Sequence, residues 1–150
     1  MKKILFVCHG NICRSPMAEF VMKDMVKKSG RADEFQIASA ATSDEEIGND
    51  MHYGSRSKLR REGIPFMPRA ARRMTKRDYD TYDYIIAMDS HNLRNIERII
   101  GSDHEHKVYR LLDFTERRGH DIADPWYTGD FDATYNDITE GCRGLLDKLK

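Results

Sequence analysis

Apolar residues are grouped along the chain in two patterns, short runs and helical repeats. Short segments rich in apolar residues predict β-strands at residues 4–7, 35–40, 84–88 and 108–111. Apolar residues that recur every three or four positions predict helices at residues 16–28, 90–100 and 131–149, and residues 52–61 predict a more polar helix. Residues 113–129 are rich in turn-forming residues and predict a loop.

The first predicted helix has clear signals at both ends. Ser15 stands where an N-cap is expected, Pro16 suits the first helical position, and Ser29-Gly30 stops the helix. The strand before it, residues 4–7, is an unbroken apolar run, which is typical of a strand buried on both faces.

Strands that alternate with helices predict an α/β fold. We expect a three-layer open sheet of four parallel strands with helices on both faces. The length of 150 residues suits one domain over residues 1–150. In such sheets a ligand binds beyond the carboxyl ends of the strands, so residues 8–15, Asp89 and the loop carrying Asp124 are expected at one edge.

Composition narrows the classes of function. The chain has 25 Lys and Arg against 25 Asp and Glu, and this balance does not favour a nucleic-acid partner. The run ILFV is too short for a signal peptide, and no stretch reaches the length of a membrane span, so a cytoplasmic protein without membrane association is expected. Three cysteines, an odd and sparse set, predict neither a disulfide framework nor a metal site.

The segment VCHGNICRSP, residues 7–16, has the composition of an anion-binding loop. It joins a strand to a helix N-terminus, where backbone N–H groups and the helix dipole favour negative charge. Gly10 and Asn11 tolerate the backbone conformations that such a nest requires. Arg14 adds a planar fork that can bind two oxygens of a phosphate.

Cys8 stands at the mouth of this loop. The nest, the helix dipole and Arg14 each favour a thiolate, and a thiolate that faces a bound phosphate is a nucleophile in position. Ser15 could donate a hydrogen bond to the sulfur when it leaves. A lone cysteine at a strand end is more often a core residue, but the spacing of Cys8, Arg14 and Ser15 favours the nucleophile.

The whole string CxGNICRSP resembles the phosphate-binding loop of the low-molecular-weight protein tyrosine phosphatases. Residues 124–127, DPWY, resemble the acid loop of that family, and ASAAT (38–42) and AMDSHNLRNI (87–96) match family stretches in order. The resemblance covers nearly the whole chain. It implies a protein-tyrosine phosphatase that hydrolyses phosphotyrosine monoesters, without a cofactor, acting on a phosphotyrosine-containing protein or peptide. A monomer is expected.

The resemblance also implies roles for single residues. Cys8 becomes the nucleophile, Arg14 the phosphate clamp and Asp124 the general acid and base, while Asn11 holds the loop in shape together with Ser39. Cys13 can pair with the nucleophile under oxidation, which makes the site redox-sensitive. The expected substrate-binding residues are His9, Gly10, Asn11, Ile12, Cys13, Ser15, Trp126 and Tyr127.

The chain departs from the family pattern at three places. His9 replaces a common Leu, and Glu45-Glu46 occupies a loop that often carries Trp. Arg69 replaces a His that braces the phosphate loop, so altered or lost support is expected there. The basic residues around Arg69 are otherwise expected to form a solvated helix face, namely Arg69, Arg72, Arg73, Lys76 and Arg77.

Three other functions share parts of this pattern. A thioredoxin-coupled arsenate reductase needs further cysteines, and residues 75–100 contain none. A phosphoarginine phosphatase of the same family carries Thr where this loop has Ile12, so Ile12 favours phosphotyrosine as the substrate. A phosphate-binding module without turnover needs neither a nucleophile nor an acid, so the presence of Cys8, Arg14 and Asp124 argues against it.

Overall fold

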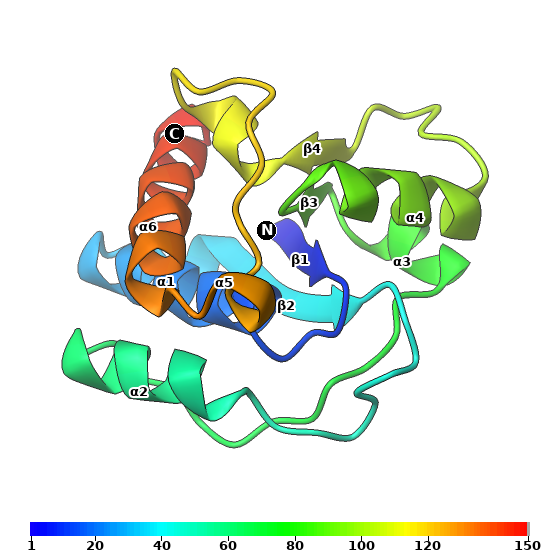
Figure 1. Cartoon of the computed structure of the whole chain (residues 1–150). Helices are drawn as coiled ribbons and strands as arrows, with labels where there is room; N and C mark the ends of the chain where they lie inside the picture. The colour runs from blue at the N-terminus through cyan, green and yellow to red at the C-terminus, as the bar shows by residue number, and fades with distance from the viewer. Residues whose placement is uncertain (150) are drawn as a thin grey trace.

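The computed structural model describes residues 1–149, and these form one parallel sheet with helices packed against it (Figure 1). The strands are β1 (Lys2–Cys8), β2 (Phe35–Ala41), β3 (Tyr84–Ala87) and β4 (Val108–Arg110). The helices are α1 (Arg14–Lys28), α2 (Tyr53–Arg61), α3 (Lys76–Thr81), α4 (Ser90–Ile100), α5 (Pro125–Thr128) and α6 (Phe131–Lys148), with 3₁₀ turns η1 (Ala32–Glu34) and η2 (Leu111–Phe114).

The sheet has the strand order β2-β1-β3-β4, and every neighbouring pair is parallel. This confirms the predicted four-stranded open sheet. β1 lies inside the sheet, and residues 4–7 are fully buried, as the unbroken apolar run predicts. β3 ends at Ala87 and β4 at Arg110, each one residue earlier than predicted.

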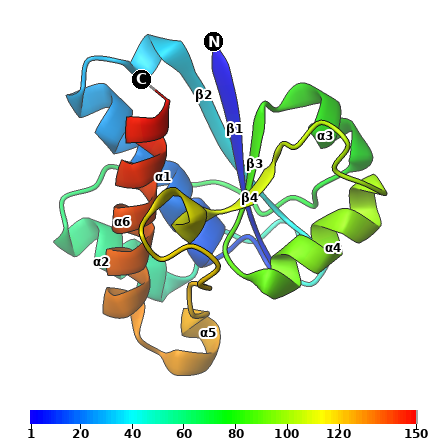
Figure 2. The same ribbon diagram turned by 90° about the horizontal axis from the view of Figure 1, so that it is seen from above.

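The helices form two layers, one on each face of the sheet (Figure 2). Side chains that alternate along β1 enter different cores: Ile4, Phe6 and Cys8 pack with α1, α2 and α6, whereas Leu5 and Val7 pack with α3 and α4. The Cys8 side chain is therefore directed to the same side as the helix that follows it. This alternation brings the thiol to the N-terminus of α1.

Helix α1 begins at Arg14, two residues before the predicted start. The prediction that Ser15 caps this helix is wrong, because the N-cap position is Cys13 and its side chain makes no capping hydrogen bond. The Ser15 hydroxyl lies instead 3.1 Å from Cys8 Sγ and accepts a hydrogen bond from Asn11 Nδ2. The first turn of α1 is thus part of the same hydrogen-bond network as the loop that precedes it.

Two short helices, α3 and α5, were not predicted. Residues 69–74 are not helical, so the expected basic helix face is wrong, and α3 starts only at Lys76. Its signal was present in the sequence: Thr75 and Asp78 have the spacing of a capping box and form one in the structure. α5 lies within the predicted loop, where Asp124 caps it and Pro125 takes the first helical position.

Helix α6 approaches the turn η2 very closely at two glycines. A Cβ added to Gly141 would lie 2.4 Å from Leu111 Cγ, and one added to Gly144 would lie 2.2 Å from the backbone oxygen of Phe114. The absence of a side chain at these positions lets the helix pack directly against the turn. This contact fixes the start of the segment that leads from η2 to Asp124.

Gly144→Ala should destabilise the protein by about 1–3 kcal/mol, because the new methyl group meets backbone and cannot be relieved by a side-chain rotation. In an unhindered helix the same change stabilises by about 0.5–1 kcal/mol, so the sign of the effect is diagnostic. Urea unfolding gives the free energy, with Arg143→Ala on the exposed side of α6 as the control. A variant as stable as the wild type would contradict the packing described.

Candidate active site

The loop between β1 and α1 is held in shape by Asn11. This residue is fully buried and has a φ of 59°, a left-handed conformation that Asn tolerates better than most residues. Its Nδ2 donates to Ser15 Oγ at 2.7 Å and to Ser39 Oγ at 2.9 Å. The expected pairing of Asn11 with Ser39 is confirmed.

Arg69 braces the same asparagine from the other side. Its Nη2 donates to the backbone oxygen of Asn11 at 2.7 Å and to Asn11 Oδ1 at 2.6 Å. Of the two expected outcomes, altered or lost support, the structure shows altered support, because the Arg69 guanidinium holds the loop. Burial lowers the pKa of Arg69, although the charges of Glu19, Asp50 and Cys8 oppose this effect.

Glu19 completes the network behind the loop and was missed in the sequence. It lies on α1 and accepts a hydrogen bond from Ser39 Oγ at 2.6 Å. The hydroxyls of Ser15 and Ser39 and the guanidinium of Arg69 thus bond the Asn11 amide directly, and Glu19 holds Ser39 in place. A single glutamate on a helix has no spacing signal that would have singled it out.

The Cys8 sulfur lies among hydrogen-bond donors. Ser15 contributes its hydroxyl at 3.1 Å and its backbone N–H at 3.4 Å from Sγ. The backbone N–H groups of residues 10–13 make no hydrogen bond to another backbone group within residues 1–149. These N–H groups are therefore available to bind an anion, as the sequence predicts.

Arg14 is 2% exposed, and its guanidinium is held by three acceptors from two other segments. Nη1 donates to Asp89 Oδ2 at 2.7 Å and to the backbone oxygen of Ile122 at 2.8 Å, while Nη2 faces Asp124 Oδ2 at 3.4 Å. Burial alone would lower the pKa of Arg14, but the neighbouring Cys8, Asp89 and Asp124 outweigh it, so the pKa is raised. The side chain stays charged despite its burial.

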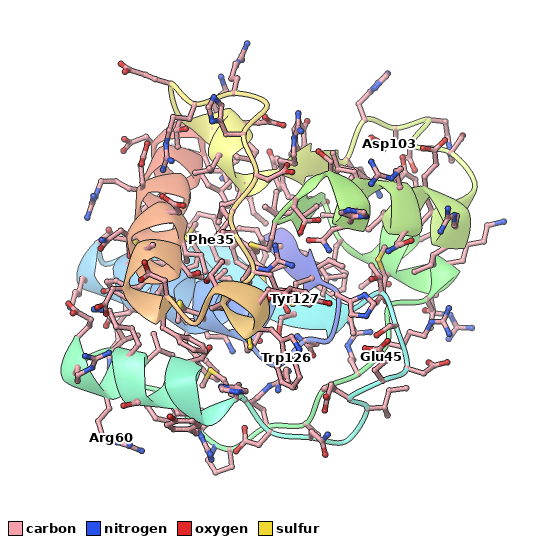
Figure 3. All side chains as sticks on the ribbon, in the orientation of Figure 1. Phe35, Glu45, Arg60, Asp103, Trp126 and Tyr127 are labelled. Atoms are coloured by element: carbon pink, nitrogen blue, oxygen red, sulfur yellow. The ribbon has the colours of Figure 1, made fainter. Side chains whose placement is uncertain are left out.

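Asp124 has two contacts that fix it at the start of α5. Its Oδ1 accepts from the backbone N–H of Trp126 at 3.0 Å, as an N-cap does, and its Oδ2 faces Arg14. Trp126 and Tyr127 follow on the same short helix and are 57% and 84% exposed (Figure 3). The Trp126 ring meets His52 edge to face, with centroids 5.8 Å apart.

One pocket brings most of the predicted site residues together. Asn11 and Ser15 do not line it; they lie buried behind the loop and act on its shape and on the sulfur. Glu45 and Glu46, from the loop after β2, add an acidic side to the opening. The lining residues are Cys8, His9, Gly10, Ile12, Cys13, Arg14, Glu45, Glu46, Asp124, Trp126 and Tyr127.

The three cysteines are all buried and free. Burial raises the pKa of Cys13 to about 12, with the charges of Cys8 and Asp124 acting in the same direction. Burial likewise raises the pKa of Cys142, which lies in the core where α6 packs against α1. Cys13 and Cys142 are therefore protonated thiols near neutral pH.

Residues 1–149 contain no cluster of three or more His, Cys, Asp or Glu side chains suited to a metal ion. In the same part of the chain, none of the helices combines the length and the apolar character needed to cross a membrane.

Comparison with known proteins links this geometry to a family. A relative from Bacillus subtilis (strain 168), named low molecular weight protein-tyrosine-phosphatase YfkJ, is 41% identical over 151 residues, covering 100% of this chain and 97% of the relative. The human low molecular weight phosphotyrosine protein phosphatase is 40% identical over 151 residues, covering 98% of this chain and 95% of its own.

Solved structures agree with these sequence matches. The crystal structure of YfkJ superposes with a TM-score of 0.95 at 41% identity, over 99% of this chain and 94% of that one. A Drosophila arginine phosphatase is also similar, with a TM-score of 0.89 at 32% identity, over 100% and 98% of the two chains. The family model described as low molecular weight phosphotyrosine protein phosphatase matches residues 3–150, and this chain belongs to that family.

Proposed function

We propose that this chain removes phosphate from phosphotyrosine in proteins through a phosphocysteine formed on Cys8. The observation that carries the proposal is that Cys8 lines one pocket together with the buried Arg14 and with loop residues whose backbone N–H groups have no backbone partner. The relatives at about 40% identity are named protein-tyrosine phosphatases, which are hydrolases, and this supports the same reaction here.

Phosphate binding uses the donors that the protein leaves free. Both hydrogens of Arg14 Nη1 are taken by Asp89 and Ile122, and one hydrogen of Nη2 is directed to Asp124. Nε and the second Nη2 hydrogen remain, and these form the side of the guanidinium that matches two phosphate oxygens. The backbone N–H groups of residues 10–13 bind the other oxygens.

The first chemical step transfers the phosphoryl group to sulfur. The Cys8 thiolate attacks phosphorus, the S–P bond forms, and the bond from phosphorus to the tyrosine oxygen breaks. The electron pair of that bond goes to the phenol oxygen, which takes a proton from the Asp124 carboxyl. Trp126 and Tyr127 flank the opening and provide flat surfaces for the leaving ring.

The second step releases phosphate and restores the enzyme. Asp124, now a carboxylate, accepts a proton from a water molecule as the water oxygen attacks phosphorus. The S–P bond breaks and its electron pair returns to sulfur. The Ser15 hydroxyl, 3.1 Å away, donates a hydrogen bond to the departing thiolate.

Several expectations from the sequence stay predictions. These are the action of residues 1–150 as one domain, a monomeric and cytoplasmic protein without a membrane or nucleic-acid partner, independence of a cofactor, and a reversible disulfide between Cys8 and Cys13. The raised pKa of Cys13 implies slow formation of that disulfide, because only a thiolate attacks an oxidised Cys8 efficiently.

Cys8→Ser should abolish turnover of phosphotyrosine while inorganic phosphate and vanadate still bind, because the loop and Arg14 remain. In the wild type, iodoacetamide at pH 7 should modify Cys8 ahead of Cys13 and Cys142, whose pKa values are raised by burial. Peptide mass spectrometry locates the modification, and added phosphate should protect the enzyme. Turnover of Cys8→Ser within tenfold of the wild type would refute the assignment.

Asp124→Asn should slow cleavage of phosphotyrosine more than cleavage of p-nitrophenyl phosphate. Tyrosine has a pKa near 10 and leaves poorly without a proton, whereas nitrophenol leaves readily as its anion. General-acid assistance is worth roughly 10²–10⁴-fold, and kcat/KM reports the first step alone. Asn also caps helices well, so α5 should be kept.

The matched control is Asp130→Asn, which makes the same change at the N-cap of α6, outside the pocket. This variant should leave kcat/KM unchanged for both substrates. An equal fall in kcat/KM for both substrates in Asp124→Asn would exclude this residue as the acid.

Arg69→Ala should lower kcat/KM about 10–100-fold, because hydrogen bonds from a charged donor to the buried Asn11 are lost. Inorganic phosphate should also inhibit Arg69→Ala more weakly than the wild type. Arg69→Lys should restore part of the lost kcat/KM and part of the lost phosphate affinity. Arg77→Ala, exposed on α3, serves as the control. If Arg69→Ala keeps kcat/KM and phosphate affinity within twofold, the loop is held without this side chain.

A further inference from the structure

Two carboxylates at the mouth of the pocket have no part in the chemistry described above. Glu45 and Glu46 line the same pocket as Cys8 and Arg14, although a site for a phosphate dianion should avoid negative charge. Figure 3 shows Glu45 on the loop after β2, while Trp126 and Tyr127 come from α5. The opening thus has an aromatic part and an acidic part.

The acidic loop is fixed against the phosphate-binding loop by backbone contacts. The Thr42 N–H donates to the backbone oxygen of Cys8 at 3.0 Å, and the Ser43 N–H donates to that of His9 at 3.1 Å. Glu46 packs on Gly10, where an added Cβ would lie only 3.4 Å from Glu46 Cγ. The two carboxylates are therefore held at the opening and are not on a free surface loop.

Neither carboxylate is neutralised by a permanent cation. Glu45 contacts His9 Nε2 at 3.0 Å, and His9 carries a charge only when protonated. Glu46 accepts from the amide of Asn49, which is neutral. Within residues 1–149, Arg14 of the same pocket is engaged by Asp89 and Asp124, and Arg73 is engaged by Asp44, the neighbour of Glu45.

The contact between Glu45 and His9 can be exchanged. Their side chains are 69% and 47% exposed, and exposed ion pairs contribute little to stability. A lysine or arginine from a bound peptide could therefore replace His9 at Glu45 at small cost. When the phosphotyrosine ring enters the pocket, the residues beside it in the peptide lie at the rim, where Glu45 and Glu46 stand.

The geometry points to Glu45 and Glu46 as specificity-determining residues that select phosphotyrosine peptides with basic residues next to the phosphotyrosine. This inference rests on the proposed function and adds the class of substrate. The floor of the pocket binds an anion and the rim binds a cation, so the preferred substrate carries both. Acidic flanking residues are repelled at the rim by the same charges.

The test compares three phosphotyrosine peptides of equal length whose neighbouring residues are Lys, Ala or Glu. For the wild type in low salt, kcat/KM should be about five- to twentyfold higher for the Lys peptide than for the Glu peptide. The ratio of kcat/KM between the Lys and Glu peptides should approach one at about 1 M salt, where the Debye length is only about 3 Å and exposed charges hardly interact.

In the double variant Glu45→Gln/Glu46→Gln the ratio should fall below about twofold, whatever happens to the absolute rates. Glu116→Gln, exposed on the loop after η2 and outside the pocket, should keep the wild-type ratio. A double variant that keeps the wild-type ratio, or a wild type that prefers the Glu peptide, would overturn the inference.

Phosphoarginine is a fourth substrate in the test, because its own guanidinium could contact the two carboxylates. A higher kcat/KM on phosphoarginine than on all three peptides would assign the carboxylates to that group and overturn the inference. Turnover of all three peptides at equal rates would overturn it and leave the proposed function standing. If neither the peptides nor p-nitrophenyl phosphate are turned over, both the inference and the proposed function are overturned.

Discussion

The buried guanidinium of Arg14 is the constraint around which the rest of the site is arranged. A charge that is 2% exposed must be compensated, and removing one partner of such a pair typically costs about 3–5 kcal/mol. The compensation comes from Asp89 after β3 and from Ile122 and Asp124 in the segment before α5. One side chain therefore draws together three segments that are far apart in the sequence.

Under the proposed function, this arrangement also decides which groups attract phosphate. The Asp89 carboxylate pairs with Arg14 at 2.7 Å, so part of the positive charge of Arg14 is balanced before any substrate arrives. The backbone N–H groups of the loop have no acceptor in the backbone, and their orientation depends on Asn11. Under the proposed function, the network of Asn11, Ser39, Glu19 and Arg69 therefore contributes to phosphate binding together with Arg14.

The sequence was sufficient for the parts of this site that are contiguous. Strand β1 and the loop after it could be predicted because Cys8, Gly10 and Arg14 lie within one short segment whose residues act on each other locally. The start of α1 was placed two residues too late. Asp124 was identified only through its resemblance to a family motif, since an aspartate before proline is otherwise a common turn residue. Apolar runs located all four strands to within a few residues.

The remaining contacts could not be predicted, for different physical reasons. The resemblance marked the position of Arg69 as one that braces the loop, but its contact with Asn11 spans 58 positions and neither residue type implies the other. Ile122 acts through its backbone oxygen, which leaves no trace in the sequence. Ser15 failed as a helix cap because its hydroxyl is used between Asn11 and Cys8, and a local rule does not foresee a tertiary contact.

The attachment of the loop after β2 has a consequence for how such proteins diversify. The main-chain N–H groups of Thr42 and Ser43 bond this loop to Cys8 and His9, and the N–H of Gly48 bonds it to Ala71. Main-chain bonds survive when side chains change. The side chains at residues 45 and 46, which line the pocket, can therefore be exchanged while the backbone contacts that hold the loop stay the same.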